Sequence, residues 1–149
     1  MNKRINLMQI HPKAYEAITV LQNYIQEAGI DPVYKLLIGI RVSEINGCTL
    51  CLEQYLKEAD RIGMIRSRAM AVSSWRQSPL FTADEKAILA LAEEMTYIYN
   101  GVSEETYNTA ELMLGEIKLA EIMLAVVTVN GWNRLAVSTR QLVYKTKLH

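Results

Sequence analysis

The sequence predicts an all-α fold of six to eight helices in a single domain that spans residues 1–149. Three observations carry this prediction. Helix start and stop signals recur along the chain, and no segment alternates convincingly between polar and apolar residues, as a half-buried strand would. Half of the 149 residues are hydrophobic while 21% are charged, which is typical of a globular chain. A chain of this length can bury a large core without disulfides or a structural metal.

The first two predicted helices begin at prolines. Pro12 stands at a first helical position, and the apolar stripe that follows it ends at Gly29. Asp31 and Pro32 repeat the start signal, a capping acid followed by proline. The stretch 34–45 is apolar on most faces, so we expect this second helix to be central.

The next helices are bounded by turn signals. Asn46-Gly47 is a strong breaker pair, and Cys48 opens a third helix that runs to Gly63, where a left-handed closing residue fits. A shorter helix is predicted over 67–75, and Ser78-Pro79 marks the loop after it.

Three further helices are predicted in the second half of the chain. Thr82-Ala83-Asp84-Glu85 is a capping box that begins a helix through about residue 99, closed by Asn100-Gly101. Ser103 starts another helix, with acids in its first turn. The last long helix is predicted over 118–140.

Charge and hydropathy exclude some classes of partner. Lys plus Arg and Asp plus Glu both number 16, so no global field attracts nucleic acid or an anionic lipid surface. The most apolar stretch, Ile122–Val129, is far shorter than the ~20 residues of a membrane span. The basic amino terminus is not followed by the apolar core of a signal peptide. We therefore expect a cytoplasmic protein with neither a nucleic-acid nor a membrane partner.

Cys48 and Cys51 are the two cysteines of the chain, three residues apart at the start of a helix. Residues at this spacing share one helix face, close enough for a disulfide. The helix amino terminus lowers a thiol pKa by less than about one unit from about 8.5, so a nearby polar group is needed to make more thiolate. Redox chemistry and two inert buried thiols are equally compatible with the spacing. Zinc is disfavoured, because only His11 and His149 remain as soft ligands.

The segment Arg41–Cys51, RVSEINGCTLC, resembles the RxSxxNGCxxC signature of the carboxymuconolactone decarboxylase family, in its AhpD-like alkyl hydroperoxidase branch. Trp75–Thr82 resembles the tryptophan-containing loop of that branch, and Asn130–Leu135 its late N-x-W-N-R segment. The resemblance covers nearly the whole chain and extends to Asn6, Pro12 and Tyr15.

This resemblance implies an all-helical protomer that forms trimers or hexamers, with the cysteine pair at the start of a buried helix. In well-described members the dithiol reduces a hydroperoxide and closes to a disulfide. A dithiol reductant then restores it, a lipoyl-bearing adaptor in the best-known system. No cofactor and no metal are implied.

The sequence departs from the family's proton relay at three positions. The relay glutamate is replaced by Leu36, the histidine between the cysteines by Leu50, and the trailing histidine by Tyr55. Leucine does not ionise, and a tyrosine pKa near 10 excludes a base at neutral pH. Tyr55 shares the helix face of the cysteines and can donate a hydrogen bond to a thiolate. The alternative for Tyr55 is a core aromatic with a satisfied hydroxyl.

Glu44 lies four residues before Cys48, and it faces the sulfurs if the chain bends little at Gly47. The alternative, slightly favoured, is an exposed glutamate that pairs with Arg41. The late segment Trp132-Asn133-Arg134 is expected to fix helix packing or a subunit contact rather than to catalyse.

The sequence thus favours a dithiol peroxidase or related thiol-disulfide oxidoreductase with the candidate catalytic residues Cys48, Cys51, Tyr55 and Glu44. The missing relay groups predict weak activity. Helix position favours Cys48 as the attacking thiolate, and proximity to Tyr55 favours Cys51. The alternative is a non-catalytic oligomeric redox sensor or ligand-binding protein. Lactone decarboxylation is disfavoured, because members with that activity generally lack the cysteine pair.

Overall fold

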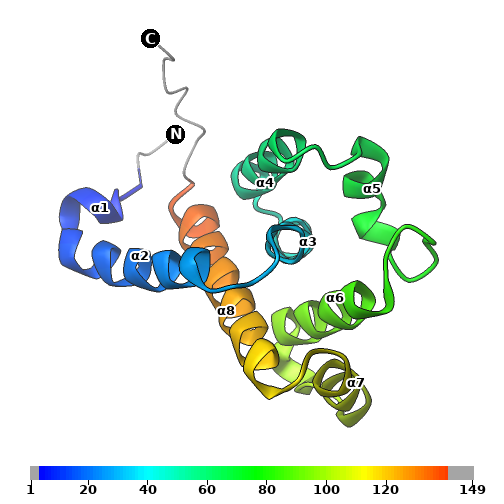
Figure 1. The fold of residues 1–149 in the computed structure, drawn as a ribbon. Coiled ribbons are helices and arrows are strands. Elements are labelled where there is room, and N and C mark those ends of the chain that lie inside the picture. The colour runs from blue at the N-terminus through cyan, green and yellow to red at the C-terminus, as the bar shows by residue number, and fades with distance from the viewer. Residues whose placement is uncertain (1–3, 141–149) are drawn as a thin grey trace.

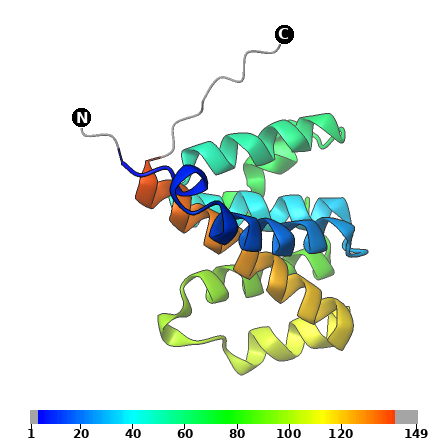
Figure 2. The same ribbon diagram turned by 90° about the vertical axis from the view of Figure 1, so that its left-hand side faces the viewer.

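The computed structural model describes residues 4–140, which contain helices and connecting turns but no strand. Figures 1 and 2 show the helices gathered around α3, with α2 and α8 crossing one side. Within this range there are eight α-helices and two short 3-10 helices: α1 (Leu7–Ile10), α2 (Pro12–Glu27), α3 (Pro32–Ile45), α4 (Thr49–Arg61), α5 (Arg66–Met70), η1 (Ala71–Ser74), α6 (Ala83–Thr96), η2 (Ile98–Asn100), α7 (Glu104–Leu114) and α8 (Glu116–Thr139).

Helix α3 is the centre of the fold, as its apolar sequence predicts. It packs against α4, α6 and α8 and is seen nearly end-on among them in Figure 1. Its buried residues divide between two apolar clusters. Ile38 and Val42 pack with residues of α6 and α8, whereas Leu37 and Ile40 pack toward α4, α5 and η1. Because each fully buried aliphatic side chain stabilises the fold by about 1.5–3 kcal/mol, α3 is held from both sides.

Local start signals are confirmed at several helices. Asp31 accepts a hydrogen bond from the Val33 amide at the start of α3. The capping box before α6 is complete, since Thr82 accepts from the Glu85 amide and Glu85 accepts from the Thr82 amide. Ser103 caps α7 with a single bond, since its hydroxyl accepts from the Thr106 amide.

Some helix boundaries differ from the predicted ones. A short helix, α1, precedes Pro12 and is capped by the Asn6 side chain. The predicted helix 67–75 divides into α5 and η1, because the hydroxyls of Ser73 and Ser74 donate to carbonyls three residues earlier and favour the tighter 3-10 turn. The helix predicted to reach residue 99 ends at Thr96, and η2 follows.

In residues 4–140 no helix combines the length and the apolar character that crossing a membrane requires.

One close contact fixes the distance between α3 and α4. A Cβ atom at Gly39 would overlap Cδ1, Cε1 and Cζ of the Tyr55 ring. The absence of a side chain on α3 at this point therefore lets the ring of Tyr55 lie directly on the helix backbone.

We predict that Gly39→Ala lowers the free energy of unfolding by about 1–3 kcal/mol, because the new methyl group must displace the Tyr55 ring. Urea unfolding followed by circular dichroism measures the change. Gly131→Ala is the matched control, a helical glycine whose added Cβ meets no atom within 4 Å. It should raise stability by up to about 1 kcal/mol through helix propensity. Equal stability of Gly39→Ala and the wild type would contradict the contact.

Candidate functional site

The cysteine pair begins where the end of α3 meets the start of α4. Gly47 adopts a left-handed conformation with φ of 63°. The Cys48 amide donates to the Ser43 carbonyl at 3.0 Å and the Gly47 amide to the Glu44 carbonyl at 3.2 Å, which together form a Schellman cap. Cys48 is also the N-cap residue of α4. The predicted Asn-Gly break therefore places the first cysteine without any intervening loop.

Cys48 and Cys51 form a disulfide across the first turn of α4, with their Cα atoms 5.3 Å apart. This confirms that the i, i+3 spacing brings the two sulfurs together. The residues are only 3% and 7% exposed, respectively. They form a small apolar cluster with Ala136 of α8, and the partly buried side chains packed against it are Leu50 and Tyr55.

Four polar side chains connect the junction between α3 and α4 to α8, and we call them the amide clamp. They are Ser43, Asn46, Asn130 and Asn133. The Asn46 side-chain amide donates to the side-chain oxygens of Asn130 and Asn133, at 3.0 and 3.1 Å. Asn133, 1% exposed, donates in turn to the Ser43 hydroxyl at 3.3 Å. Asn130 also donates to Thr96 of α6. The clamp thus fixes the start of α4 against α8 with neutral groups.

The neighbours of Asn133 in the sequence also serve packing, as expected. The ring of Trp132 packs edge to face with Tyr15 of α2, with ring centroids 5.2 Å apart. Arg134 donates to the side-chain oxygen of Asn130 one helical turn earlier. The NGWNR segment therefore joins α8 to α2 and to the α3–α4 junction.

Tyr55 lies beside the disulfide, on the face of α4 that the helical spacing predicts. It packs against the cysteine cluster and against both of the larger apolar clusters. Burial raises the pKa of the Tyr55 hydroxyl to about 12. This group therefore stays protonated at neutral pH and can donate a hydrogen bond to a thiolate.

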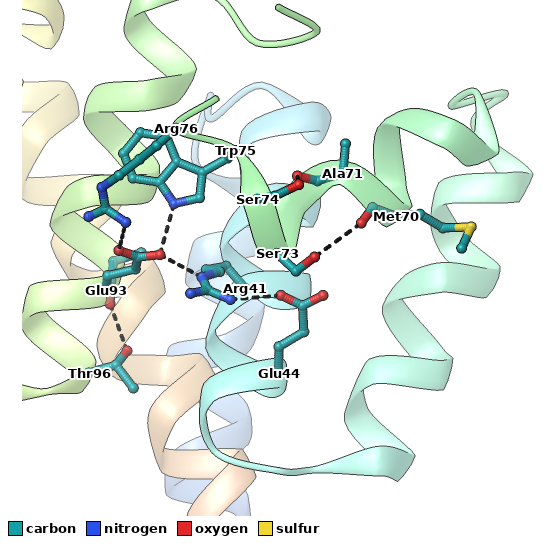
Figure 3. A network of polar contacts seen from close by, with 11 residues as sticks. Arg41, Glu44, Met70, Ala71, Ser73, Ser74, Trp75, Arg76, Glu93 and Thr96 are labelled. Carbon is teal, nitrogen blue, oxygen red and sulfur yellow. Dashed lines mark hydrogen bonds and ion pairs between the residues drawn. The ribbon is translucent and has the colours of Figure 1, made fainter. Parts of the chain in front are cut away.

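Glu93 of α6 is the centre of a second polar network, drawn in Figure 3. Its Oε1 accepts from Arg41 Nε at 2.7 Å and from Trp75 Nε1 at 2.8 Å, and its Oε2 contacts Arg76 Nη1 at 2.6 Å. Burial alone raises the pKa of Glu93, but the hydrogen bonds from Trp75, Arg41 and Arg76 outweigh it and lower the pKa below its ordinary value. Glu93 thus anchors the η1 loop to α3 and α6 as a carboxylate.

Glu44 pairs with Arg41, as the slightly favoured expectation has it, but it is partly buried rather than exposed. Its Oε2 lies 3.1 Å from Arg41 Nη1, and Figure 3 shows the two side chains side by side. Desolvation raises the pKa of the Glu44 carboxyl, although Arg41 opposes the shift. The left-handed turn at Gly47 separates Glu44 from Cys48, so the small bend on which a sulfur-facing orientation depends is not present.

The remaining relay positions fall into different surroundings. Leu36 is buried in the cluster that faces α4, α5 and η1, whereas Leu50 is beside the cysteines. His11 is exposed before α2, and His149 lies outside the described residues. No group of three or more His, Cys, Asp or Glu side chains in residues 4–140 is arranged to hold a metal.

Two structural roles were missed from the sequence. Asn46 was identified only as a helix breaker, and Glu93 was not singled out at all. The sequence held one indication of the role of Asn46, which is that it belongs to the same RxSxxNGCxxC motif as Ser43. Glu93 offered no such signal, since its partners Arg41 and Trp75 are 52 and 18 residues away.

We predict that Asn133→Ala lowers the free energy of unfolding by about 1–3 kcal/mol, because the side chains of Asn46 and Ser43 lose their buried partner. Thermal or urea unfolding measures the loss. Asn108→Ala, on an exposed position of α7, is the control and should change stability by less than about 0.5 kcal/mol. A variant at Asn133 as stable as that control would refute the clamp.

Glu93→Gln should be less stable than the wild type at pH 7, by about 1–3 kcal/mol, because two arginines lose their carboxylate partner. The folded-state pKa of Glu93 is lowered, so its stabilisation is present above the ordinary pKa of 4.5 and is lost as the pH falls through the folded value. The difference in the free energy of unfolding between the wild type and Glu93→Gln should therefore decrease as the pH falls. Urea unfolding from pH 7 to pH 3 tests this, with exposed Glu16→Gln as control. A difference in the free energy of unfolding that stays constant from pH 7 to pH 3 would contradict the lowered pKa of Glu93.

Comparison with known proteins places this geometry among relatives. The chain is 32% identical to ATU0492 from Agrobacterium tumefaciens, a protein of unknown function suggested to be an antioxidant defence protein AhpD, with a TM-score of 0.90 over 95% of this chain and 97% of that one. It is 27% identical to the uncharacterized protein YdfG of Bacillus subtilis over 93% of this chain and 95% of that protein. The debrominase Bmp8 shares the fold, with a TM-score of 0.78 at 20% identity over 93% of this chain and 75% of that one.

The match to a family model agrees with these similarities. Residues 12–94, more than half of the chain, match the carboxymuconolactone decarboxylase family. This range contains the whole RxSxxNGCxxC motif and the Glu93 network. The chain therefore belongs to the carboxymuconolactone decarboxylase family and to its AhpD-like members.

Proposed function

We propose that the protein is a dithiol peroxidase, or a closely related thiol-disulfide oxidoreductase, that reduces hydroperoxides through a Cys48–Cys51 disulfide cycle. The observation that carries the proposal is the disulfide across the first turn of α4, with the residues that precede it held by the Schellman cap and the amide clamp. The similarity to ATU0492 supports the same class of activity.

The cycle balances with the two cysteines alone. One thiolate attacks the peroxide, an S–O bond forms, the O–O bond breaks, and an alcohol leaves after it takes up a proton. The second cysteine attacks the sulfenic acid, the S–S bond forms, and water leaves. A dithiol reductant then returns two electrons and two protons and is itself oxidised to a disulfide.

The residues around the sulfurs have different roles in the proposed cycle. Cys48, as the N-cap of α4, is favoured as the thiolate by the helix amino terminus. Tyr55 donates a hydrogen bond to whichever sulfur carries the charge. Glu44, which the turn at Gly47 separates from Cys48, is held by Arg41 and takes no direct part at the sulfurs. Activity is weak, because Leu36 and Leu50 supply no acid or base.

The lipoyl-bearing reductant stays a prediction from the resemblance, the oligomer one from the resemblance and the composition, and the cytoplasmic location one from the sequence alone. Support for a trimer or hexamer comes from large apolar side chains left exposed on α1, α2 and α8, among them Met8, Ile10, Val20, Tyr24, Leu124, Val127 and Val137.

Burial of both cysteines supports the alternative, a non-catalytic redox sensor or ligand-binding member of the family. Such a protein would form the disulfide slowly and would not turn over with a dithiol reductant. The two functions differ in turnover rather than in the ability to close the disulfide.

The experiment follows hydroperoxide consumption by the protein with a dithiol reductant, together with the mass of the cysteine-containing peptide. The wild type should consume hydroperoxide and lose two hydrogen atoms per dithiol, whereas Cys48→Ser and Cys51→Ser should lose catalysis. Ser67→Ala, an exposed position on α5, is the control. Consumption that persists in both cysteine variants refutes the proposal, and disulfide formation without turnover supports the sensor.

A further inference from the structure

A small cavity lies between α2, α3 and α8, and Tyr55 of α4 is part of its lining. It has about 20 Å³ of space for a water-sized guest, enough for one molecule of water. Its lining consists of Gln22, Ile25, Gln26, Lys35, Ile38, Tyr55, Ala125, Thr128 and Val129.

Tyr55 connects this cavity with the disulfide. The side chain starts on α4 beside Cys51, lies against Gly39 of α3, and reaches the cavity lining. Its hydroxyl donates to none of the described groups. In residues 4–140, the one fully enclosed side-chain nitrogen or oxygen without a hydrogen-bond partner is Arg68 Nε. The Tyr55 hydroxyl also has no partner, so it is not fully enclosed.

The other polar groups of the lining suit a bound water. The Thr128 hydroxyl donates to the Leu124 carbonyl at 2.8 Å, which leaves its oxygen able to accept a hydrogen bond. At the rim, Lys35 Nζ donates to the backbone oxygen and the side-chain oxygen of exposed Gln26, at 3.3 and 3.4 Å. Lys35 is the charged group of the lining; α2 and α8 contribute only neutral side chains.

A thiolate formed at the buried sulfurs needs a proton or a hydrogen-bond donor. Opening the disulfide releases a thiolate into a cluster whose other side chains, Ala136 and Leu50, carry no polar group. An isolated charge there is strongly disfavoured, so a proton or a hydrogen-bond donor must reach it. Tyr55 is the polar side chain of this cluster, but a hydroxyl that holds its own proton firmly gives one up only if another replaces it at once.

We propose that the cavity binds one water molecule and that this water and the Tyr55 hydroxyl form a proton relay between solvent and the Cys48–Cys51 pair. The inference rests on the proposed redox function. When an external thiolate attacks the disulfide, an S–S bond forms to it, the internal S–S bond breaks, and the released thiolate takes the Tyr55 proton. Tyr55 takes a proton from the water, and solvent restores the water at the Gln26 rim. Tyr55 is thus catalytic, and Thr128 positions the water.

The test measures reduction of the Cys48–Cys51 disulfide by dithiothreitol, in ordinary and in heavy water, with mass spectrometry after alkylation. Hydroperoxide is not used, so failure of the peroxidase proposal does not affect this measurement. Tyr55→Phe should slow reduction by about tenfold or more and reduce the solvent isotope effect. Thr128→Val should act in the same direction to a smaller extent. Thr19→Val is the matched control, because its hydroxyl makes the same bond to the carbonyl four residues earlier but lies outside the cavity lining.

Thermal unfolding of each variant separates chemistry from folding. Variants that keep the wild-type melting temperature and lose rate and isotope effect support the relay. Wild-type rates and isotope effects in Tyr55→Phe and Thr128→Val overturn it. A high-resolution crystal structure provides a second measurement, in which a water oxygen about 2.8 Å from the Tyr55 hydroxyl is expected and a dry cavity contradicts the proposal.

Discussion

The position of the cysteine pair depends on one turn of the backbone. Cys48 is at once the last residue of the α3 cap and the first cap residue of α4, so the two helices share a boundary without a flexible linker. Gly47 makes this possible, because the left-handed conformation that the Schellman cap requires is strained for residues with a side chain. Since α3 is buried on most faces and ends directly at Cys48, the packing of α3 in the core fixes where the sulfurs lie.

The two polar networks hold this junction in different ways. The amide clamp uses neutral hydrogen bonds, so it fixes Asn46 to α8 without adding charge near the sulfurs. The Glu93 network uses charge, and it ties Arg41 of α3 to η1 and α6. Polar side chains in the cysteine cluster are therefore few, and the proposed cycle depends on the α4 amino terminus and Tyr55.

The same helical frame carries different chemistry in different proteins. Bmp8, a debrominase, shares the fold at 20% identity, a level at which only the frame can be compared. Function in this frame is decided by the side chains around the reacting atoms rather than by the fold. In the present chain, Leu36, Leu50 and Tyr55 stand at the positions where the family resemblance implies a proton relay, and the proposed cycle therefore uses the tyrosine hydroxyl and water instead.

The sequence by itself determined most of the helices, the central place of α3, the break at Asn46-Gly47 and the closeness of Cys48 to Cys51. These features depend on local spacing, on caps and on backbone preferences, which neighbouring residues dictate. The tertiary structure alone decided the partners of Asn46, the anchoring of Glu93 and the cavity lined by Tyr55. Those contacts join residues of different helices, some more than 80 positions apart. They arise only when packing fixes which helix faces meet, and one sequence carries no local signal for that choice.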